Sequence, residues 1–460
     1  MGGIDRAVAY TVLGRAWSVL AGPVTLIFLA RFLSPTEQGF YFTFGSILSL
    51  QIFFELGLSA VILQFASHER ARLDWTSEGT LAGDSVAKAR LASLLRRALT
   101  WYGVMAGAFV AGVLPAGLFF FSRSQQADMA VMWKLPWMWV VVVAACLLLT
   151  SPLFALLEGC GLVAEIALLR TYQAIAGNVL FWLALAGGFK LFAAPILATT
   201  GLLWGALWLT LRKRHMLSDL IRFRHETVEI DWWGEVWSFQ WRIALSGVSG
   251  YFTFLFFTPV LFAFHGATIA GQMGMSMSVM TSLFNTAMAW VGTKTAPFGT
   301  LIARREFAQL DRLFFRSLWQ SLAVIVLGGA GFWAVASYLH VINHPLSQRI
   351  LAPLPLGLLV IATVLVSVVA GQATYLRAHK QEPFLPISIL LGCSVGLSSY
   401  FLGKHFAATG MMFGYLSLYL ILGLGAGTWV FAQKRRLWHS DAKTEAGAET
   451  GMLAIEGNRH

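Results

Sequence analysis

The chain has little charge and little cysteine, and each shortage excludes a class of protein. Only 12% of its 460 residues are charged, about half the share usual in soluble domains. A soluble protein of this size needs more polar surface, so we expect most of the chain to face lipid. Its three cysteines, Cys146, Cys160 and Cys393, are too few and too scattered for a disulfide framework or a zinc site.

Common nucleotide-binding and metal-binding motifs are also missing. The sequence contains no G-x-x-x-x-G-K-[ST] run, and none of its ten histidines lies in an H-E-x-x-H pattern. We therefore predict no cofactor, no metal and no enzymatic activity. The net charge of +11 does not indicate nucleic acid as a partner, because the basic residues lie between apolar segments, where membrane topology explains them.

Long apolar segments are what the chain has in abundance, with 57% hydrophobic residues. A membrane helix needs about 20 mostly apolar residues. The segments show no period-2 alternation, which favours helices over a β-barrel. We expect the first segment to be a membrane helix rather than a cleaved signal. The fold class predicted is an all-α polytopic membrane protein with about twelve transmembrane helices, at 7–32, 39–65, 98–121, 136–157, 165–188, 192–211, 236–265, 268–292, 313–339, 353–376, 384–403 and 407–431.

Lysine and arginine are unequally divided between the two sets of loops. One set holds most of them, including Arg212, Lys213 and Arg214. The opposite set holds six, which are Arg31, Arg123, Lys134, Lys190, Arg349 and Lys404. Because positive loops stay inside, both termini are predicted to be cytoplasmic. The short outer loops leave little room for an extracytoplasmic catalytic domain.

A weak internal repeat divides the chain into two sets of six helices. Residues 38–43 (QGFYFT) open the second predicted helix, and residues 270–275 (AGQMGM) open the eighth. We predict an N-terminal lobe at 1–211, a basic cytoplasmic inter-lobe loop at 212–235, a C-terminal lobe at 236–431 and a disordered cytoplasmic tail at 432–460. Transporters are often built from such repeats around the substrate path.

The predicted cytoplasmic loop at 66–97 is long and has two interpretations. Its second half mixes Val86, Leu91, Leu94 and Leu95 with basic residues. This pattern is typical of an amphipathic helix on the inner leaflet. A solvated connector whose charges set the topology explains the pattern equally well, and the sequence leaves both open.

Charged residues inside predicted membrane helices are candidates for function, because a charge in lipid is costly. Arg15, Arg242 and Glu55 lie roughly 12, 9 and 15 Å from the cytoplasmic ends of their helices, at about 1.5 Å per residue. One interpretation is a central cavity where Arg15 and Arg242 bind a diphosphate, Lys294 is an entrance ligand and Glu55 couples an ion or acts as counter-ion. The alternative is that the arginines extend to the headgroups, Lys294 sets topology and Glu55 forms a structural pair.

Short motifs in order along the chain resemble those of polysaccharide-export flippases, including the O-antigen flippases. They are residues 31–39 (RFLSPTEQG), 53–58 (FFELGL), 157–161 (LEGCG) and 270–274 (AGQMG), followed by Trp290, Lys294, 297–299 (PFG) and 302–304 (IAR). The resemblance implies the multidrug/oligosaccharidyl-lipid/polysaccharide exporter superfamily, whose members have two six-helix lobes around a central cavity and work by alternating access. The long loop at 66–97 departs from the family pattern.

The resemblance also implies a substrate. This branch is expected to flip undecaprenyl-diphosphate-linked oligosaccharide, such as an O-antigen repeat unit, from the inner to the outer leaflet of the bacterial cytoplasmic membrane. Cavity arginines would hold the diphosphate, which fits Arg15 and Arg242. Membrane lipids and, by family association, glycan-assembly enzymes are the expected partners. The alternatives are a drug or small-molecule exporter of the same superfamily, or a membrane-embedded glycan polymerase or ligase.

Overall fold

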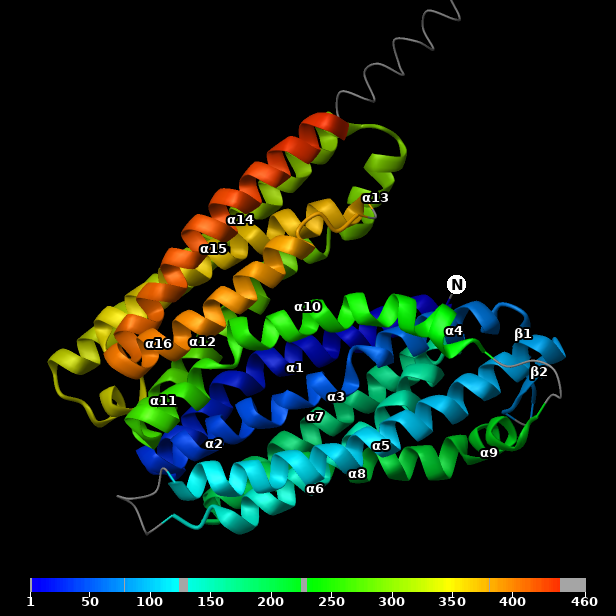
Figure 1. Ribbon diagram of the computed structural model, residues 1–460, viewed down its shortest axis with the longest axis horizontal. Helices are drawn as coiled ribbons and strands as arrows, with labels where there is room; N and C mark the ends of the chain where they lie inside the picture. Colours follow the sequence, from blue (N-terminus) through cyan, green and yellow to red (C-terminus); the bar gives the residue numbers. More distant parts are fainter. Residues whose placement is uncertain (1, 78, 124–130, 225–229, 380, 439–460) are drawn as a thin grey trace, which may run out of the picture. The chain divides into compact units, whose positions relative to one another are not determined.

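A computed structural model describes residues 2–77, 79–123, 131–224, 230–379 and 381–438 (Figure 1). The described residues are almost entirely helical, and their only strands are the short antiparallel pair β1 (Leu73–Trp75) and β2 (Leu81–Gly83). The chain divides into two compact units, residues 1–275 and 276–460.

Unit 1 is a bundle of long helices joined by short connections. Its helices are α1 (Gly2–Phe32), α2 (Pro35–Leu48), α3 (Ile52–Glu55), α4 (Leu58–Arg70), α5 (Ser85–Arg123), α6 (Lys134–Gly159), α7 (Val163–Ala186), α8 (Ala193–Trp208), α9 (Arg214–Arg222), α10 (Ser238–Phe254) and α11 (Phe257–His265). Helix α12 (Ala267–Gly292) begins in unit 1 and crosses its boundary. Unit 2 continues with α13 (Thr295–Ala303), α14 (Phe307–Val341), α15 (Pro353–Ala378) and α16 (Leu385–Leu418).

The described helices agree with the predicted spans. Eight are long and apolar enough to cross a membrane, or ten if two pairs bent by 47° and 42° each count as one span. The last of the eight, Leu385–Trp438, has 54 residues, roughly 80 Å of helix. It breaks at Phe406 and Ala407, so it is long enough for two spans. Helix α12 covers the eighth predicted span with 26 residues, although it is not among the helices long and apolar enough to be counted. The all-α membrane fold is confirmed.

The second predicted helix is bent immediately after Glu55. Leu56 and Gly57 have φ values of 52° and 69°, in the left-handed region, which ends α3 and turns the chain by 47° into α4. Leucine rarely adopts this conformation. A Cβ on Gly57 would lie 2.4 Å from Cγ2 of Ile243, so glycine is also required for the close approach of α10. The bend places Glu55 at a helix end.

A capping box begins α2, as the sequence Ser-Pro-Thr-Glu indicates. The Ser34 hydroxyl accepts a hydrogen bond from the Glu37 backbone N–H at 3.1 Å, and the Glu37 carboxylate accepts one from the Ser34 N–H at 2.8 Å. The second oxygen of Glu37 lies 2.9 Å from Nζ of Lys190. Glu37 is buried, so these contacts satisfy a carboxylate that would otherwise be costly.

The structure of the segment at 66–97 differs from both interpretations of its sequence, the helix on the inner leaflet and the solvated connector. The hairpin β1–β2 leads directly into α5, which runs without interruption for 39 residues. Leu91, Leu94 and Leu95 are fully buried, and α5 packs against α9, whose apolar face is also buried. The leucines therefore lie inside protein rather than on a leaflet or in solvent. The segment is an extension of the third membrane helix with its own small core.

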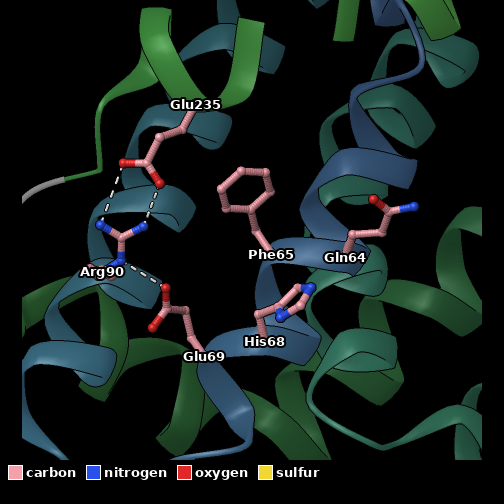
Figure 2. A pocket seen from close by; sticks show the side chains of 6 residues that line it. All are labelled: Gln64, Phe65, His68, Glu69, Arg90 and Glu235. Carbon is pink, nitrogen blue, oxygen red and sulfur yellow. Dashed lines mark hydrogen bonds and ion pairs between the residues drawn. The ribbon is translucent and has the colours of Figure 1, made fainter. Parts of the chain in front are cut away.

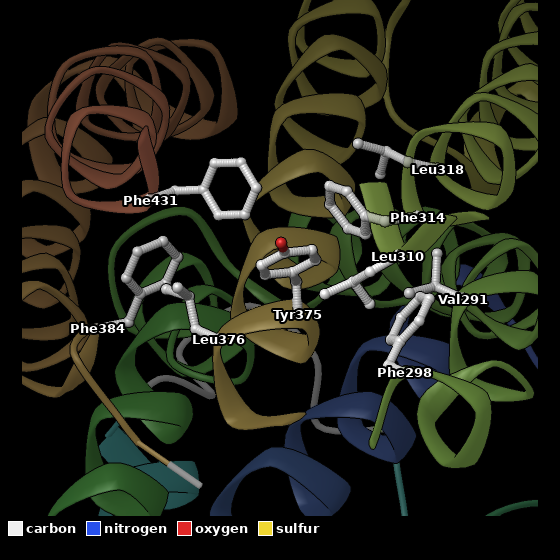
Figure 3. Close-up of a cluster of buried hydrophobic side chains, with 9 residues drawn as sticks. All are labelled: Val291, Phe298, Leu310, Phe314, Leu318, Tyr375, Leu376, Phe384 and Phe431. Carbon is white, nitrogen blue, oxygen red and sulfur yellow. The ribbon is translucent and has the colours of Figure 1, made fainter. Parts of the chain in front are cut away.

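Unit 2 contains an apolar cluster near the ends of α14 and α15 (Figure 3). The Phe314 and Tyr375 rings are 4.9 Å apart, and Phe431 contacts both. Above the cluster, Asp311 accepts hydrogen bonds from the Tyr375 hydroxyl and from Arg435 Nε, each at 3.0 Å. An apolar core and an ion pair thus fix the same three helices together.

The helix that contains Arg435 extends into the predicted tail. It continues to Trp438, whose ring stacks on His379 at 3.9 Å. The first residues of the segment predicted to be disordered therefore belong to the last helix and pack on unit 2. Residues 439–460 lie outside the described residues.

The Asp311–Arg435 pair gives a stability prediction. Replacing Arg435 by Ala leaves a mostly buried carboxylate without its bidentate partner, and we expect unfolding in detergent to lose about 1–3 kcal/mol. Arg436→Ala, a matched change at an exposed neighbour, should leave the unfolding transition unchanged. Equal losses in the two variants would show that the pair does not stabilise unit 2.

Cys160 gives a prediction about pH. It lies in the turn after α6, where Trp75 donates a hydrogen bond to its carbonyl at 3.2 Å, and burial raises the pKa of its thiol to about 12. At pH 8 the thiol is protonated and unreactive. In a Cys146→Ser, Cys393→Ser background, N-ethylmaleimide should modify Cys160 rapidly only after denaturation. Rapid modification of the folded protein at pH 8 would contradict this burial.

Candidate functional site

Arg15 lies on α1, whose orientation is set by its packing on α7. The Trp17 and Trp182 rings are 6.1 Å apart, and Trp182 Nε1 donates a hydrogen bond to the Thr25 hydroxyl at 3.0 Å. A Cβ on Gly14 would lie 2.9 Å from the Thr171 hydroxyl. These contacts identify the face of α1 that is covered by α7, and at 3.6 residues per turn Arg15 projects from a different face.

Arg15 lies on an exposed face of α1 that carries polar side chains together with the exposed Val12 and Val19. Thr11 and Ser18 lie one turn before and one turn after it, at the spacing that places side chains on the same side of a helix. All three are exposed, and the two hydroxyls bond only to carbonyls of their own helix, of Ala7 and Gly14. Among the described residues, no carboxylate pairs with Arg15. A guanidinium without a counter-ion on an exposed helix face can bind an anionic group.

Glu55 is held by α5 at the bend between α3 and α4. The Tyr102 hydroxyl donates a hydrogen bond to Glu55 at 3.3 Å and shares another with Ser59 at 2.8 Å. Tyr102 is fully buried and Glu55 is half-buried. Within the described part of the chain, Arg15 does not pair with this carboxylate, although the sequence permits that pair. Glu55 is therefore a polar contact between helices at a point where the chain bends.

The contacts of the other two predicted ligands, Arg242 and Lys294, are less well defined. Arg242 lies within α10, and its side chain is outside the described residues. Lys294 precedes the first turn of α13, is half-buried and has no ion pair among the residues that the structure describes. Arg15, Arg242 and Glu55 belong to unit 1 and Lys294 to unit 2, and a common role for the four residues stays a prediction.

A charged cavity in unit 1 was not predicted (Figure 2). It encloses about 420 Å³ and is lined by Gln64, Phe65, His68 and Glu69 from α4, Arg90 from α5 and Glu235 from the π-helical turn Trp232–Trp237. Arg90 Nε lies 2.7 Å from Glu69, and Arg90 Nη2 lies 2.5 Å from Glu235. The hydrogen bonds that Arg90 donates to Glu235, and secondly to Glu69, raise the pKa of the Arg90 guanidinium.

No sequence spacing signals this cluster. Arg90 is separated from its two partners by 21 and 145 residues, and all three lie in segments that read as charged loops. The available sign was that the loop at 66–97 is long for the family it resembles. In the structure this segment forms β1–β2 and the first part of α5, which packs against α9.

The two copies of the internal repeat, residues 38–43 and 270–275, contact each other in unit 1 where α2 and α12 begin. A Cβ on Gly39 would lie 1.9 Å from the Ala267 carbonyl oxygen, and one on Gly271 would lie 2.9 Å from the Gly39 nitrogen. Gln38 is buried and donates a hydrogen bond to the Gly271 carbonyl at 2.9 Å. We call these contacts the glycine seam. Its backbones approach so closely that only glycine fits, as in other tightly packed membrane helices.

The glycine seam predicts an asymmetric response to a single methyl group. Gly39→Ala forces α2 away from the start of α12, and we expect a loss of about 1–3 kcal/mol in thermal unfolding, the usual effect of overpacking. Gly45→Ala adds the same methyl on the same helix where nothing lies within 4 Å, so it should be neutral or slightly stabilising. A neutral Gly39→Ala would show that the seam tolerates separation.

Comparisons with known proteins identify the fold. No protein family and no curated protein matches the chain. Its structure is similar to an inward-facing multidrug resistance MATE family transporter of the MOP superfamily, with 14% identity, TM-score 0.62 and coverage of 94% of this chain and 99% of that one. A MOP superfamily transporter from Pyrococcus furiosus shows 14% identity, TM-score 0.58 and coverage of 96% of each chain. Lipid II flippase MurJ shows 10% identity, TM-score 0.60 and coverage of 94% and 87%. The chain has the two-lobed fold of these transporters.

Proposed function

We propose that the protein is a transporter that flips an undecaprenyl-diphosphate-linked oligosaccharide from the inner to the outer leaflet of the bacterial cytoplasmic membrane by alternating access. The observation that supports this most directly is Arg15. It lies about two turns inside a membrane helix, on an exposed face that it shares with Thr11 and Ser18, without a carboxylate among the described residues. A charge in that place is costly, and an anionic substrate offsets the cost.

A diphosphate suits this site because of its geometry and charge. Guanidinium is planar and always charged, and it offers several donors to phosphate oxygens. Arg242 and Lys294 are proposed as further diphosphate ligands, on the strength of their positions in the sequence alone. Glu55 is proposed as a counter-ion or coupling carboxylate, since it lies beside a bend that can change shape during transport.

Other parts of the proposal rest on the sequence and on the shared fold. Both termini are proposed to be cytoplasmic, with lobes at 1–211 and 236–431 joined by the basic segment 212–235. The repeat that suggests this division is supported by the glycine seam, where its two copies meet. Association with glycan-assembly enzymes is proposed from the family resemblance only.

The experiment compares Arg15→Ala with Arg15→Lys and Arg6→Ala in a host that lacks its own glycan flippase, at matched membrane levels. Loss of charged hydrogen bonds worth about 1.5–3 kcal/mol predicts a flipping rate lower by roughly ten- to a hundredfold for Arg15→Ala. Arg15→Lys should retain part of the rate. Arg6→Ala changes an exposed arginine nearer the start of the same helix and should behave as wild type.

Each failure has a defined meaning. Full activity of Arg15→Ala would reduce this residue to an anchor at the headgroups, although the protein would remain a flippase. If the wild-type chain restores no lipid-linked glycan but lowers host sensitivity to organic cations, the flippase proposal is wrong and the drug-exporter alternative replaces it.

A further inference from the structure

We propose that the charged cavity of unit 1 (Figure 2) is a second ligand site, which binds the saccharide part of the lipid-linked substrate. This inference rests on the proposed function and deepens it. The cavity belongs to unit 1 alone and is separate in sequence from Arg15. Its volume of about 420 Å³ lies within the range of small-molecule sites, about 300–1,000 Å³.

The charges of the cavity argue against a phosphate ligand. Arg90 is the only cation among its described lining residues besides the titratable His68, and two carboxylates, Glu69 and Glu235, already engage it. Arg90, Glu69 and Glu235 together carry a net charge of −1, which disfavours a diphosphate. A neutral ligand meets no such penalty. The diphosphate and the uncharged sugars of one substrate would therefore bind at different places.

Hydrogen-bonding groups remain available on one wall. Gln64 and His68 are exposed, lie one turn apart on α4 and have no side-chain partner among the described residues. One oxygen of Glu69 accepts from Arg90, and no bond to the other is seen in the described part of the chain. An amide, an imidazole and a carboxylate together offer both donors and acceptors. This combination suits hydroxyl groups, each of which donates and accepts.

An apolar surface completes the site. The ring of Phe65 projects into the space between Glu235 and His68 (Figure 2). The C–H faces of a sugar ring pack well against an aromatic face, whereas a linear polar ligand gains less from it. A polyhydroxylated ring thus matches the polar and the aromatic walls together.

The walls are held rigidly before any ligand arrives. Arg90, on α5, connects this helix to α4 through the Glu69 carboxylate and to the turn Trp232–Trp237 through the Glu235 carboxylate. Ser93, one turn further along α5, accepts a hydrogen bond from the buried Ile230 N–H at 3.1 Å. Such preorganisation reduces the entropy lost on binding. Arg90 is therefore a positioning residue, and Gln64, Phe65 and His68 are the proposed contacts.

The test is saturation-transfer NMR on the full-length protein in lipid nanodiscs with free mono- and disaccharides, including N-acetylglucosamine, galactose and glucose. Wild type should transfer saturation to at least one of them, and excess pyrophosphate should not compete. Gln64→Ala and His68→Ala should weaken binding by about three- to tenfold for each lost hydrogen bond. Both side chains are exposed, so the fold should survive. Leu63→Ala, at an exposed position of α4 outside the lining, is the matched control.

The outcomes separate this inference from the flippase proposal. Failure of every saccharide to bind, equal binding by Gln64→Ala and the control, or competition by pyrophosphate would each overturn the saccharide site. None of these results depends on flipping. If saccharides bind as expected but the wild type flips no lipid-linked glycan, the site stands as a saccharide site and the flippase proposal fails.

Discussion

The cost of leaving a backbone polar group unpaired in lipid is the constraint on which this structure depends. It forces the chain into helices, so each departure from helical geometry needs a local reason. The bend at Leu56 and Gly57 lies where α10 approaches and where Glu55 meets Tyr102. The break at Phe406 and Ala407 divides one long helix into two spans. At these two places the irregular backbone coincides with a close approach of helices and with the division between two spans.

Much of the fold was predictable because hydrophobic length is a local property. The predicted spans overlap the described helices, although α2 begins at Pro35, where Ser34 and Glu37 form a capping box, before the predicted start at residue 39. The bend after Glu55 was not predicted, because a leucine followed by a glycine does not indicate that both residues adopt left-handed backbone angles. The segment at 66–97 was misread for a related reason. Amphipathic periodicity indicates that one face of a helix is apolar, but it does not indicate whether protein or lipid covers that face.

The two candidate sites, Arg15 and the charged cavity around Arg90, also differ in how far the sequence alone could identify them. Arg15 is a candidate from the sequence alone because a charge inside a membrane helix is conspicuous, and in the structure it lies on an exposed face of α1. Arg90 could not, because its partners come from distant segments and nothing local distinguishes it from a topogenic arginine. The two arginines are chemically opposite. One lacks a carboxylate among the described residues, and the other is neutralised by two. Counter-ions, rather than residue types, decide which guanidinium is available to an anion.

The glycine seam has a consequence for how such a protein can change over evolution. The atom nearest to the missing Cβ of Gly39 is the carbonyl oxygen of Ala267, which every amino acid carries. A larger residue at position 39 therefore cannot be accommodated by a smaller one at position 267. Contacts between side chains can drift in pairs, but a contact between two backbones cannot. This junction should be among the most invariant points of the chain, while leaving no covariation by which an alignment would reveal it.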